Sequence, residues 1–532
     1  MTVNKMILNI KRKQSNILIG VFICFCVLSG CGKDTIPTPE NTEPTPETPE
    51  TPTIDDPENG IIADIEDITL KGWVHCGKKG MKGVVVTDGT HVTNTDEKGI
   101  YRLQRDSKAV HVYISSPSGY TVKTVNSVPQ FYAVIDQKKK VEQKDFELLP
   151  LDNDDNKHTF VAIGDPQLYR DHEINYLRAA IEDLKDWIQQ NRAQKCVHYI
   201  TLGDLVFDKP QYHEPSKEIF SRLNAPVYNV IGNHDHVFSQ ADIPAKINDS
   251  KADTLYKRIY GPTYYSYNRG KVHYVVLDDV EYWGGPNKKY VDAISDEQIA
   301  WLKEDLKYVP KSQAVIVALH APTKRRNSTP SFGNRTQLYQ LLQGYANIQI
   351  LSGHTHWNSV VNEDNSPITE HIVAAICGNW WQPELMCSEG TPIGYKIFDV
   401  DGTNIQWQYK CIDHPVDYQA RIYPPENRIS ILHPTSIVGN VWDWDPSWKV
   451  EYSTDNGVSF QPMIRPANMY DIKAYAAFGA QGDNSFPADR TWIEASQSDH
   501  MFYCPPGTTG DHIKIRITTR FGKVSDYSVP TN

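Results

Sequence analysis

Six continuous apolar runs of strand length lie within one stretch of this chain, and each ends abruptly at a glycine or a polar side chain. The runs read HTFVAIG, CVHYITLG, PVYNVIG, VHYVVLD, AVIVALH and IQILSG. Strands without polar alternation are covered on both faces. Between them, apolar spacing of three and four predicts a helix through residues 174–188, and Ser295 with Gln298 forms a capping-box pattern. Residues 157–415 are therefore predicted to form a layered α/β domain.

Short β-rich segments flank that domain on both sides. Residues 67–150 alternate apolar runs with Asp88-Gly89 and Lys98-Gly99, which are typical of hairpin turns, and predict a small β-sandwich that serves as a spacer or docking module. Residues 420–532 are aromatic and turn-rich and predict a second small, β-rich domain. Three tryptophans there are interpreted as core, with a ligand platform as the alternative: Trp442, Trp444 and Trp448.

The first thirty residues differ from the rest of the chain. Basic residues precede the apolar run NILIGVFICFCVLSG, which is typical of an export signal covering residues 1–30. Leu-Ser-Gly-Cys at 28–31 resembles a bacterial lipobox, so Cys31 is expected to carry acyl chains; an ordinary signal peptide is the alternative. The Pro/Thr/Glu-rich residues 31–66 predict a linker. We expect a lipid-anchored protein of the bacterial cell envelope, facing the periplasm or the cell exterior.

The formal net charge of −11 bears on the partners of the protein. An acidic chain gains nothing from nonspecific attraction to a phosphate backbone. Nucleic acid is therefore not expected as a binding partner.

Polar side chains gather where the predicted strands end. In open α/β sheets functional groups lie just past the carboxyl ends of strands. Those ends here are Asp165-Pro166-Gln167, Gly203-Asp204, Gly232-Asn233-His234-Asp235, His320 and Gly353-His354-Thr355-His356. Oxygen and imidazole ligands together suit Mn²⁺, Fe or Zn²⁺. Seven positions are too many for one ion, but with one shared carboxylate they make two sets of four, as a two-metal hydrolase requires.

These motifs, in this order, resemble the calcineurin-like metallophosphoesterase superfamily, whose pattern is D-x-H, G-D, G-N-H-[DE], H and G-H-x-H. Four of the five motifs are unaltered in this sequence. The flanking segments resemble those of a bacterial subgroup with dedicated N- and C-terminal domains. The resemblance implies an α/β fold, a metallophosphoesterase β-sandwich flanked by helices.

The resemblance also implies roles for single residues. It places Asp165, Gln167 and His356 at a first metal and Asn233, His320 and His354 at a second, with Asp204 bridging the two. It implies hydrolysis of a small phosphoester by a metal-bridging hydroxide, without a covalent enzyme intermediate. His234 would assist the leaving group, and Asp235 would orient its imidazole.

Gln167 is the departure from the family pattern, because it stands where the family has histidine. A neutral amide oxygen is a harder and weaker donor than imidazole nitrogen, so we expect Mn²⁺ to be favoured at this site. The alternative is that Gln167 does not bind and water fills the position.

Side chains that follow the ligands are expected to line the substrate pocket. The predicted contacts are Tyr169, Arg170, His236, Arg325 and Trp380. The basic run 324–326 is interpreted either as a phosphate contact or as a solvated loop, and Trp380-Trp381 either as a stacking surface or as the seam to the C-terminal domain. Asp208 is expected to support the loop that carries Asp204.

Two functions remain open from the sequence. The favoured one is a binuclear metallophosphoesterase acting outside the cytoplasm, on monoesters, diesters or pyrophosphates that motif spacing does not distinguish. The alternative is a noncatalytic surface lipoprotein whose β modules bind glycan or cell wall. The intact His234-Asp235 pair and the unaltered ligand positions favour the enzyme.

Overall fold

The computed structural model describes residues 55–237, 249–284, 289–326, 328, 331–362, 366–425, 435–479, 492–510 and 512–530. The chain divides into two compact units, Met1–Pro52 and Thr53–Asn532, and all described residues belong to the second. The signal peptide, Cys31 and most of the linker lie outside the described residues, so these stay predictions. No helix in the described ranges is both long and apolar enough to span a membrane.

The first central sheet contains the strands that precede Asp165 and Asp204. Its order is β16-β15-β14-β25-β26, in which the first three strands are parallel, β25 runs antiparallel to β14, and β26 runs antiparallel to β25. The strands are β16 (Val227–Val230), β15 (Cys196–Leu202), β14 (Lys157–Ile163), β25 (Gly394–Asp401) and β26 (Asn404–Cys411).

Side chains on β14 alternate between two cores. Phe160 and Ala162 pack with the second sheet, whereas Val161 and Ile163 pack with helix α1 (Glu173–Arg192). Helix α1 buries Leu177, Ile181, Leu184 and Ile188, the face that the apolar spacing predicts. Helix α2 (His213–Ser221) contributes Ile219 and Phe220 to the same core. This sheet is therefore covered on both faces, as its uninterrupted apolar runs predict.

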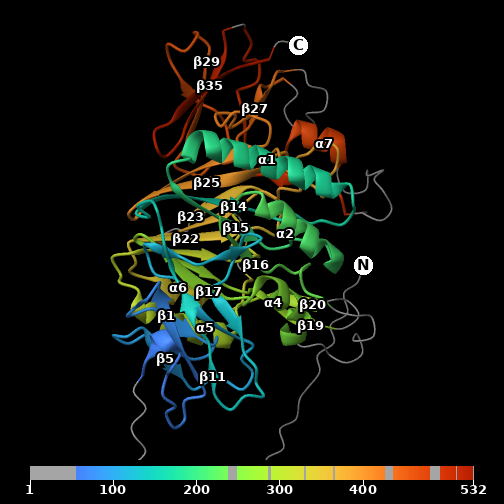
Figure 1. Cartoon of the computed structure of the whole chain (residues 1–532). Coiled ribbons are helices and arrows are strands. Elements are labelled where there is room, and N and C mark those ends of the chain that lie inside the picture. Colours follow the sequence, from blue (N-terminus) through green and yellow to red (C-terminus); the bar gives the residue numbers. More distant parts are fainter. Residues whose placement is uncertain are drawn as a thin grey trace, which may run out of the picture. The chain divides into compact units, whose positions relative to one another are not determined.

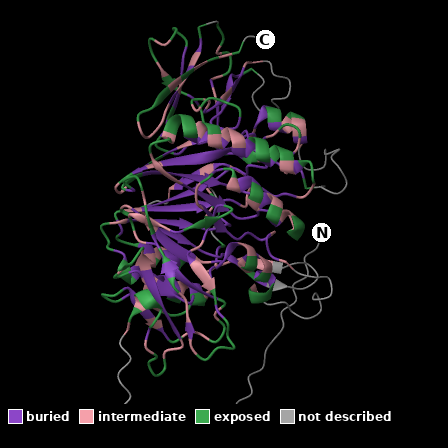
Figure 2. Cartoon of the chain, viewed as in Figure 1, coloured by how far each residue is buried: buried purple, intermediate pink, exposed green. Residues whose placement is uncertain are grey.

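The second central sheet has the order β17-β18-β21-β22-β24-β23 and is parallel from β18 to β24. Helices α5 and α6 pack into the core that it shares with the first sheet (Figure 1), and Figure 2 shows buried strands between helices whose outer faces are exposed. The elements are β17 (Tyr265–Arg269), β18 (Val272–Val276), β21 (Ala314–Ala318), β22 (Asn347–Ser352), β24 (Ile368–Ile372), β23 (Ser359–Asn362), α5 (Asp296–Asp305) and α6 (Arg335–Leu342). The α/β fold class, two sheets flanked by helices, is confirmed.

The capping box predicted at α5 is only half formed. The Ser295 hydroxyl accepts from the Gln298 backbone N–H at 3.2 Å. The Gln298 side chain does not return to Ser295; it bonds both the N–H and the carbonyl of Asp278, at 2.9 and 2.7 Å. The glutamine satisfies two backbone groups there instead of one at the helix end.

The N-terminal module is a small β-sandwich of two sheets. It adjoins the central sheets, since the Tyr264 hydroxyl donates to the Gly89 carbonyl at 2.9 Å and Ser266 Oγ lies 2.9 Å from Ser115 Oγ. Its longer strands are β1 (Leu70–Cys76), β3 (Val85–Thr87), β5 (Ile100–Leu103), β6 (His111–Ser115) and β10 (Tyr132–Val134).

The C-terminal domain is β-rich and includes one short helix, α7 (Ile472–Phe478). Its three tryptophans at 442, 444 and 448 are buried, so the core interpretation is confirmed. Lys396, on β25, forms a fully buried ion pair with Asp443 at 2.7 Å, which joins this domain to the first sheet. The main strands are β27 (Arg421–Tyr423), β28 (Val438–Asn440), β29 (Lys449–Ser453), β33 (Met501–Tyr503), β34 (Lys514–Thr518) and β35 (Val524–Ser528).

Candidate metal centre

The carboxyl ends of the parallel strands from both sheets meet at one place. Asp165 follows β14, Asp204 follows β15 and Asn233 follows β16 in the first sheet. His320 follows β21 and His354 follows β22 in the second. Two sheets that face each other thus bring together residues that are almost 190 positions apart in the sequence, as with the His354 N–H, which donates to Asp165 Oδ1 at 3.0 Å.

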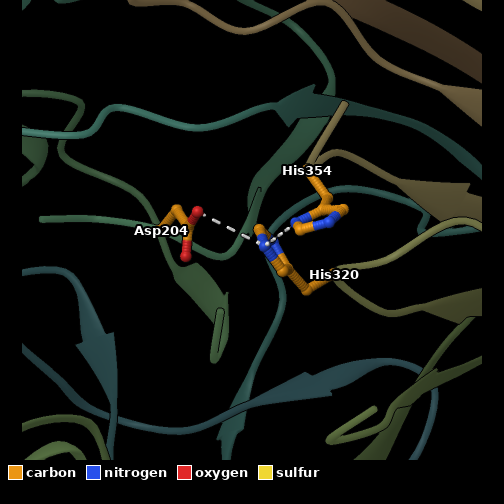
Figure 3. A group of neighbouring side chains, drawn as sticks. All are labelled: Asp204, His320 and His354. Carbon is orange, nitrogen blue, oxygen red and sulfur yellow. Dashed lines mark hydrogen bonds and ion pairs between the residues drawn. The ribbon is translucent and has the colours of Figure 1, made fainter. Parts of the chain in front are cut away.

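The four residues predicted for the second metal form a tight group, and Figure 3 shows three of them pointing toward one another. Asp204, His320 and His354 each offer one ligand atom, and these atoms lie within 4.8 Å of one another. Asn233 Oδ1 is 3.0 Å from both His320 Nε2 and His354 Nδ1. His320 Nε2 is 3.4 Å from Asp204 Oδ2. Four donor atoms therefore converge on a space that suits one cation.

The residues predicted for the first metal are joined in pairs. Gln167 Nε2 donates to Asp204 Oδ2 at 2.8 Å, and His356 Nε2 lies 3.8 Å from Asp165 Oδ1. Two buried atoms here have no hydrogen-bond partner, namely Gln167 Oε1 and His356 Nε2. Because a buried polar atom without a partner is destabilising, both atoms fit the binding of a cation.

Two of the imidazoles are held with a lone pair directed at the site. His320 Nδ1 donates to the Leu202 carbonyl at 2.7 Å, and His356 Nδ1 donates to the Gly378 carbonyl at 2.9 Å. In its neutral form each ring therefore keeps its lone pair on Nε2, as metal-binding histidines do. Without an ion, the negative charge of Asp204 raises the pKa of His320 in spite of its burial, so that this ring is protonated. Burial, together with the positive charge of His320, lowers the pKa of His354 to about 3, and burial lowers that of His356 to about 4, so both rings are neutral near pH 7.

The two central carboxyl groups differ in charge. Burial, together with the negative charge of Asp204, raises the pKa of Asp165 well above its usual range. The pKa of Asp204 is lowered in spite of its burial, because positive charge on His320 and His234 favours its ionised form. Two neighbouring buried carboxyl groups repel each other when both are ionised, and bound cations would favour the ionised form of both.

The backbone at the predicted ligands is strained. Five of the seven have positive φ angles: Asp165, Gln167, Asp204, His354 and His356, between 41° and 64°. Residues other than glycine rarely adopt this region, and such strain clusters at functional sites. The motif glycines give the room that close packing requires, since a methyl group at Gly232 would lie 2.3 Å from Asp204 Oδ1 and one at Gly353 would lie 2.5 Å from Asp165 Oδ2.

His234 is oriented by a different carboxylate from the one that the motif implied. Its Nδ1 lies 3.0 Å from Asp208 Oδ1. Asp235 instead accepts from the backbone N–H groups of Val206 and Gly232, at 3.2 and 3.0 Å, and so closes its own loop. The expected role of Asp235 is therefore corrected, because each of its oxygens accepts from a backbone N–H. The expected support of the Asp204 loop by Asp208 stays a prediction.

An aromatic wall lies beside His234 and His356; we use this term for Phe207, Trp492 and Trp380. Phe207 lies over the His234 ring with centroids 4.1 Å apart, and Trp492 stacks on Phe207 at 5.9 Å. Trp380 lies 4.5 Å from His356 and meets Trp492 edge-on at 6.1 Å. Trp380 thus lies both beside the site and at the seam, whereas Trp381 is buried and bonds the Pro166 carbonyl. Phe207 and Trp492 were not predicted, because no motif marks them.

The other residues predicted to line the pocket differ in exposure and in their partners. Tyr169 and Arg170 are half-buried, and both backbone N–H groups donate to Glu173. Arg325 is exposed, whereas Arg326 pairs with Asp499 at 2.8 Å and so serves the seam to the C-terminal domain instead of a phosphate. The prediction for His236 is corrected, because its ring is fully buried beside Asp249 and is not accessible to a substrate.

Three family models match this chain in order. The model for the N terminal of calcineurin-like phosphoesterase matches residues 68–151, the model for calcineurin-like phosphoesterase matches residues 158–358, and the model for the C terminal of calcineurin-like phosphoesterase matches residues 370–524. The central match contains all seven predicted ligands and ends two residues beyond the last of them, His356.

Individual relatives are distant. The uncharacterized protein YvnB of Bacillus subtilis (strain 168) is 24% identical over 212 residues, which cover 37% of this chain and 15% of that relative's length. A purple acid phosphatase from yellow lupin seeds is 16% identical, with a TM-score of 0.34, over 49% of this chain and 52% of its own. A metallophosphoesterase from Sphaerobacter thermophilus is 13% identical, with a TM-score of 0.23, over 48% of this chain and 89% of its own.

Proposed function

This chain belongs to the calcineurin-like phosphoesterases and is a metal-dependent phosphoesterase, and from that premise we propose that it hydrolyses phosphate mono- or diesters of small organic molecules with two bound cations. The observation that carries the proposal is the convergence of Asp204, His320 and His354 within 4.8 Å of one another. The unpartnered atoms of Gln167 and His356 beside them supply the remaining donors for a second ion.

The bound cations would supply Lewis-acid stabilisation of the phosphoryl group and activation of the attacking water. The donor set fits them: Asp165, Gln167 and His356 would hold one ion, Asn233, His320 and His354 the other, and Asp204 both. The amide oxygen of Gln167 favours Mn²⁺ at the first position, because hard oxygen donors suit that ion.

In the proposed reaction His234 acts on the leaving group. Its backbone lies next to the donor cluster, since the His234 N–H donates to Asp204 Oδ1 at 2.8 Å, and Asp208 holds the ring through Nδ1 at 3.0 Å. With Nδ1 held by a carboxylate, Nε2 is the nitrogen that gives a proton to the departing ester oxygen. Asp208 holds the ring in that orientation and stabilises its charged form.

The aromatic wall supports an organic leaving group. Phe207 covers one face of His234, and Trp492 extends that surface with 43% of its area exposed. Flat rings at this position stack on planar or apolar groups, each such contact contributing about 0.5–1.5 kcal/mol. Aryl or nucleoside-like esters therefore fit better than a bare phosphate.

The site of action in the proposal is outside the cytoplasm. The lipobox-like residues 28–31 support an acyl anchor on Cys31, and the Pro-rich linker after it would hold the enzyme away from the bilayer. An enzyme anchored in the envelope would act on small phosphoesters outside the cytoplasm. Its acidic chain does not favour nucleic acid as a substrate.

The test is metal reconstitution followed by a substrate panel. Full-length protein is stripped with chelator, reloaded with Mn²⁺, Fe²⁺, Co²⁺ or Zn²⁺, and assayed on aryl monoesters, aryl diesters and pyrophosphates. We expect hydrolysis to return with Mn²⁺ and to be lost in Asp204→Asn, which removes the shared carboxylate. A fully metal-loaded protein that hydrolyses none of these would contradict the proposal and favour a noncatalytic surface lipoprotein.

A further inference from the structure

A second group of acidic side chains lies outside the predicted catalytic ligands. Asp249 begins helix α3 (Asp249–Ala252), Asp253 precedes helix α4 (Thr254–Tyr260), and Asp278 follows β18. One carboxylate oxygen from each lies within 4.8 Å of the other two. Asp253 and Asp278 are buried, with exposures of 1% and 4%. The Asp249 side chain is 40% exposed and lies at the rim. Three carboxylates this close, two of them buried, repel one another unless positive charge compensates them.

The surrounding side chains compensate only part of the negative charge of these three carboxylates. Lys257 Nζ lies 2.6 Å from Asp253 Oδ2. Glu281 on the neighbouring hairpin and Asp279 add negative charge nearby. Backbone N–H groups reach one oxygen each of Asp249 and Asp278, from Tyr282 at 2.9 Å and Val280 at 3.3 Å. Asp253 Oδ1 is buried and has no hydrogen-bond partner.

A histidine side chain provides an independent indication of a ligand. His236 Nδ1 donates to the Gly232 carbonyl at 2.9 Å, which leaves the lone pair of the neutral ring on Nε2. That Nε2 is fully buried, has no hydrogen-bond partner and faces Asp249 Oδ1 at 3.8 Å. A lone pair that faces a carboxylate is unfavourable, and a cation between the two atoms removes the conflict.

We propose that Asp249, Asp253, Asp278 and His236 bind one divalent cation, separate from the two at the catalytic centre. Three carboxylates with one imidazole form a donor set typical of first-row ions such as Mn²⁺. The ion neutralises two of the acidic charges, and Lys257 neutralises the third. It also gives a partner to both unpartnered atoms, Asp253 Oδ1 and His236 Nε2.

The site connects two loops of the catalytic centre. His236 is two residues beyond His234 on one loop. Asp278 precedes Asp279, whose carboxylate accepts from the backbone N–H groups of His320 and Ala321 at 2.8 and 2.7 Å. The cation therefore holds together the loop that carries the proton donor and the residue that supports a metal ligand.

Metal content per chain tests the proposal without an activity assay. Full-length protein is saturated with Mn²⁺, freed of excess ion and analysed by elemental mass spectrometry. We expect three ions in the wild type, two in Asp278→Asn and two in His236→Gln. The matched control is Asp305→Asn, which removes a buried carboxylate that is already paired with His273 and Ser266 and should keep all three ions.

The Asp204→Asn background separates this site from the catalytic one. That variant should retain one Mn²⁺ and show a rise in Tm on adding Mn²⁺, and the additional change Asp278→Asn should abolish both. If Asp278→Asn fails to fold, Asp249→Asn at the rim of the cluster serves in its place. The proposal is wrong if Asp278→Asn or Asp249→Asn keeps the full metal content, because the acidic groups would then be held by protons and Lys257 alone.

Discussion

Replacing Asp208 with asparagine tests which carboxylate serves the leaving-group histidine. The change keeps the size and hydrogen-bonding capacity of the side chain but removes its charge. In the structure this side chain, and not that of Asp235, lies 3.0 Å from His234 Nδ1. A neutral partner supports the imidazole orientation less firmly and stabilises its protonated form less.

The expected size of the effect follows from that one contact. A hydrogen bond to a charged group contributes about 1.5–3 kcal/mol, and a neutral one about 0.5–1.5 kcal/mol. The difference of about 1–1.5 kcal/mol corresponds to a fivefold to tenfold loss of rate where proton donation limits the reaction. About a quarter of the His234 side chain and of the Asp208 side chain is exposed. Solvent screening therefore places the loss of rate at the lower end of this range, about fivefold.

The assay is kcat/KM on two Mn²⁺-dependent substrates, an alkyl phosphate ester and a p-nitrophenyl ester. The alkyl leaving group needs a proton, whereas p-nitrophenolate leaves without one, so Asp208→Asn should slow the first about fivefold and the second little. Asp235→Asn is the control, since it replaces one of the two oxygens that accept from the Gly232 and Val206 backbone with an amide donor, and it should lower Tm while affecting both substrates equally. The reasoning is refuted if Asp235→Asn, and not Asp208→Asn, discriminates between the two esters.

Three further changes test other parts of the structure. Gln167→His adds an imidazole and should tighten the first site about tenfold while shifting its preference from Mn²⁺ toward Zn²⁺, as measured by metal titration; unchanged preference and turnover would show that Gln167 is not a ligand. Trp492→Ala should raise KM for aryl esters about fivefold and leave methyl phosphate unaffected, because it removes a stacking surface. Burial lowers the pKa of His158 to about 4, so its neutral form contributes stability that is present above pH 6.5 and is lost as the pH falls toward 4. On going from pH 7.5 to pH 5 the wild type should therefore lose about 2 kcal/mol more unfolding free energy than His158→Gln, measured by urea denaturation, and equal losses would contradict the shift.

The sequence predicts the sheets and the positions of the donor residues well, because both depend on local patterns. Apolar runs that end in Asp204 or His320 define strand exits, and parallel strands place such exits at one edge of a sheet. The helix through 174–188 follows in the same way from its apolar face. The assignment of each donor to a metal stays a prediction until ions are measured.

The sequence does not reveal which side chains form hydrogen bonds or ion pairs with one another. Asp235 is next to His234 in the chain, yet its oxygens close the turn on which it stands, and Asp208 reaches the ring from another strand exit. Arg326 resembles a phosphate contact until the C-terminal domain brings Asp499 beside it. These outcomes depend on distances between segments far apart in sequence, which residue spacing does not encode.

The buried pair of Lys396 and Asp443 has a consequence for the order in which the protein is made. On the ribosome, β14, β15 and β16 emerge more than 150 residues before β25, the strand that pairs with β14 and carries Lys396. The ammonium group of Lys396 reaches its carboxylate only after residue 443 has been synthesised. The first sheet therefore keeps an unpaired ammonium group on Lys396 until the beginning of the C-terminal domain has also been translated.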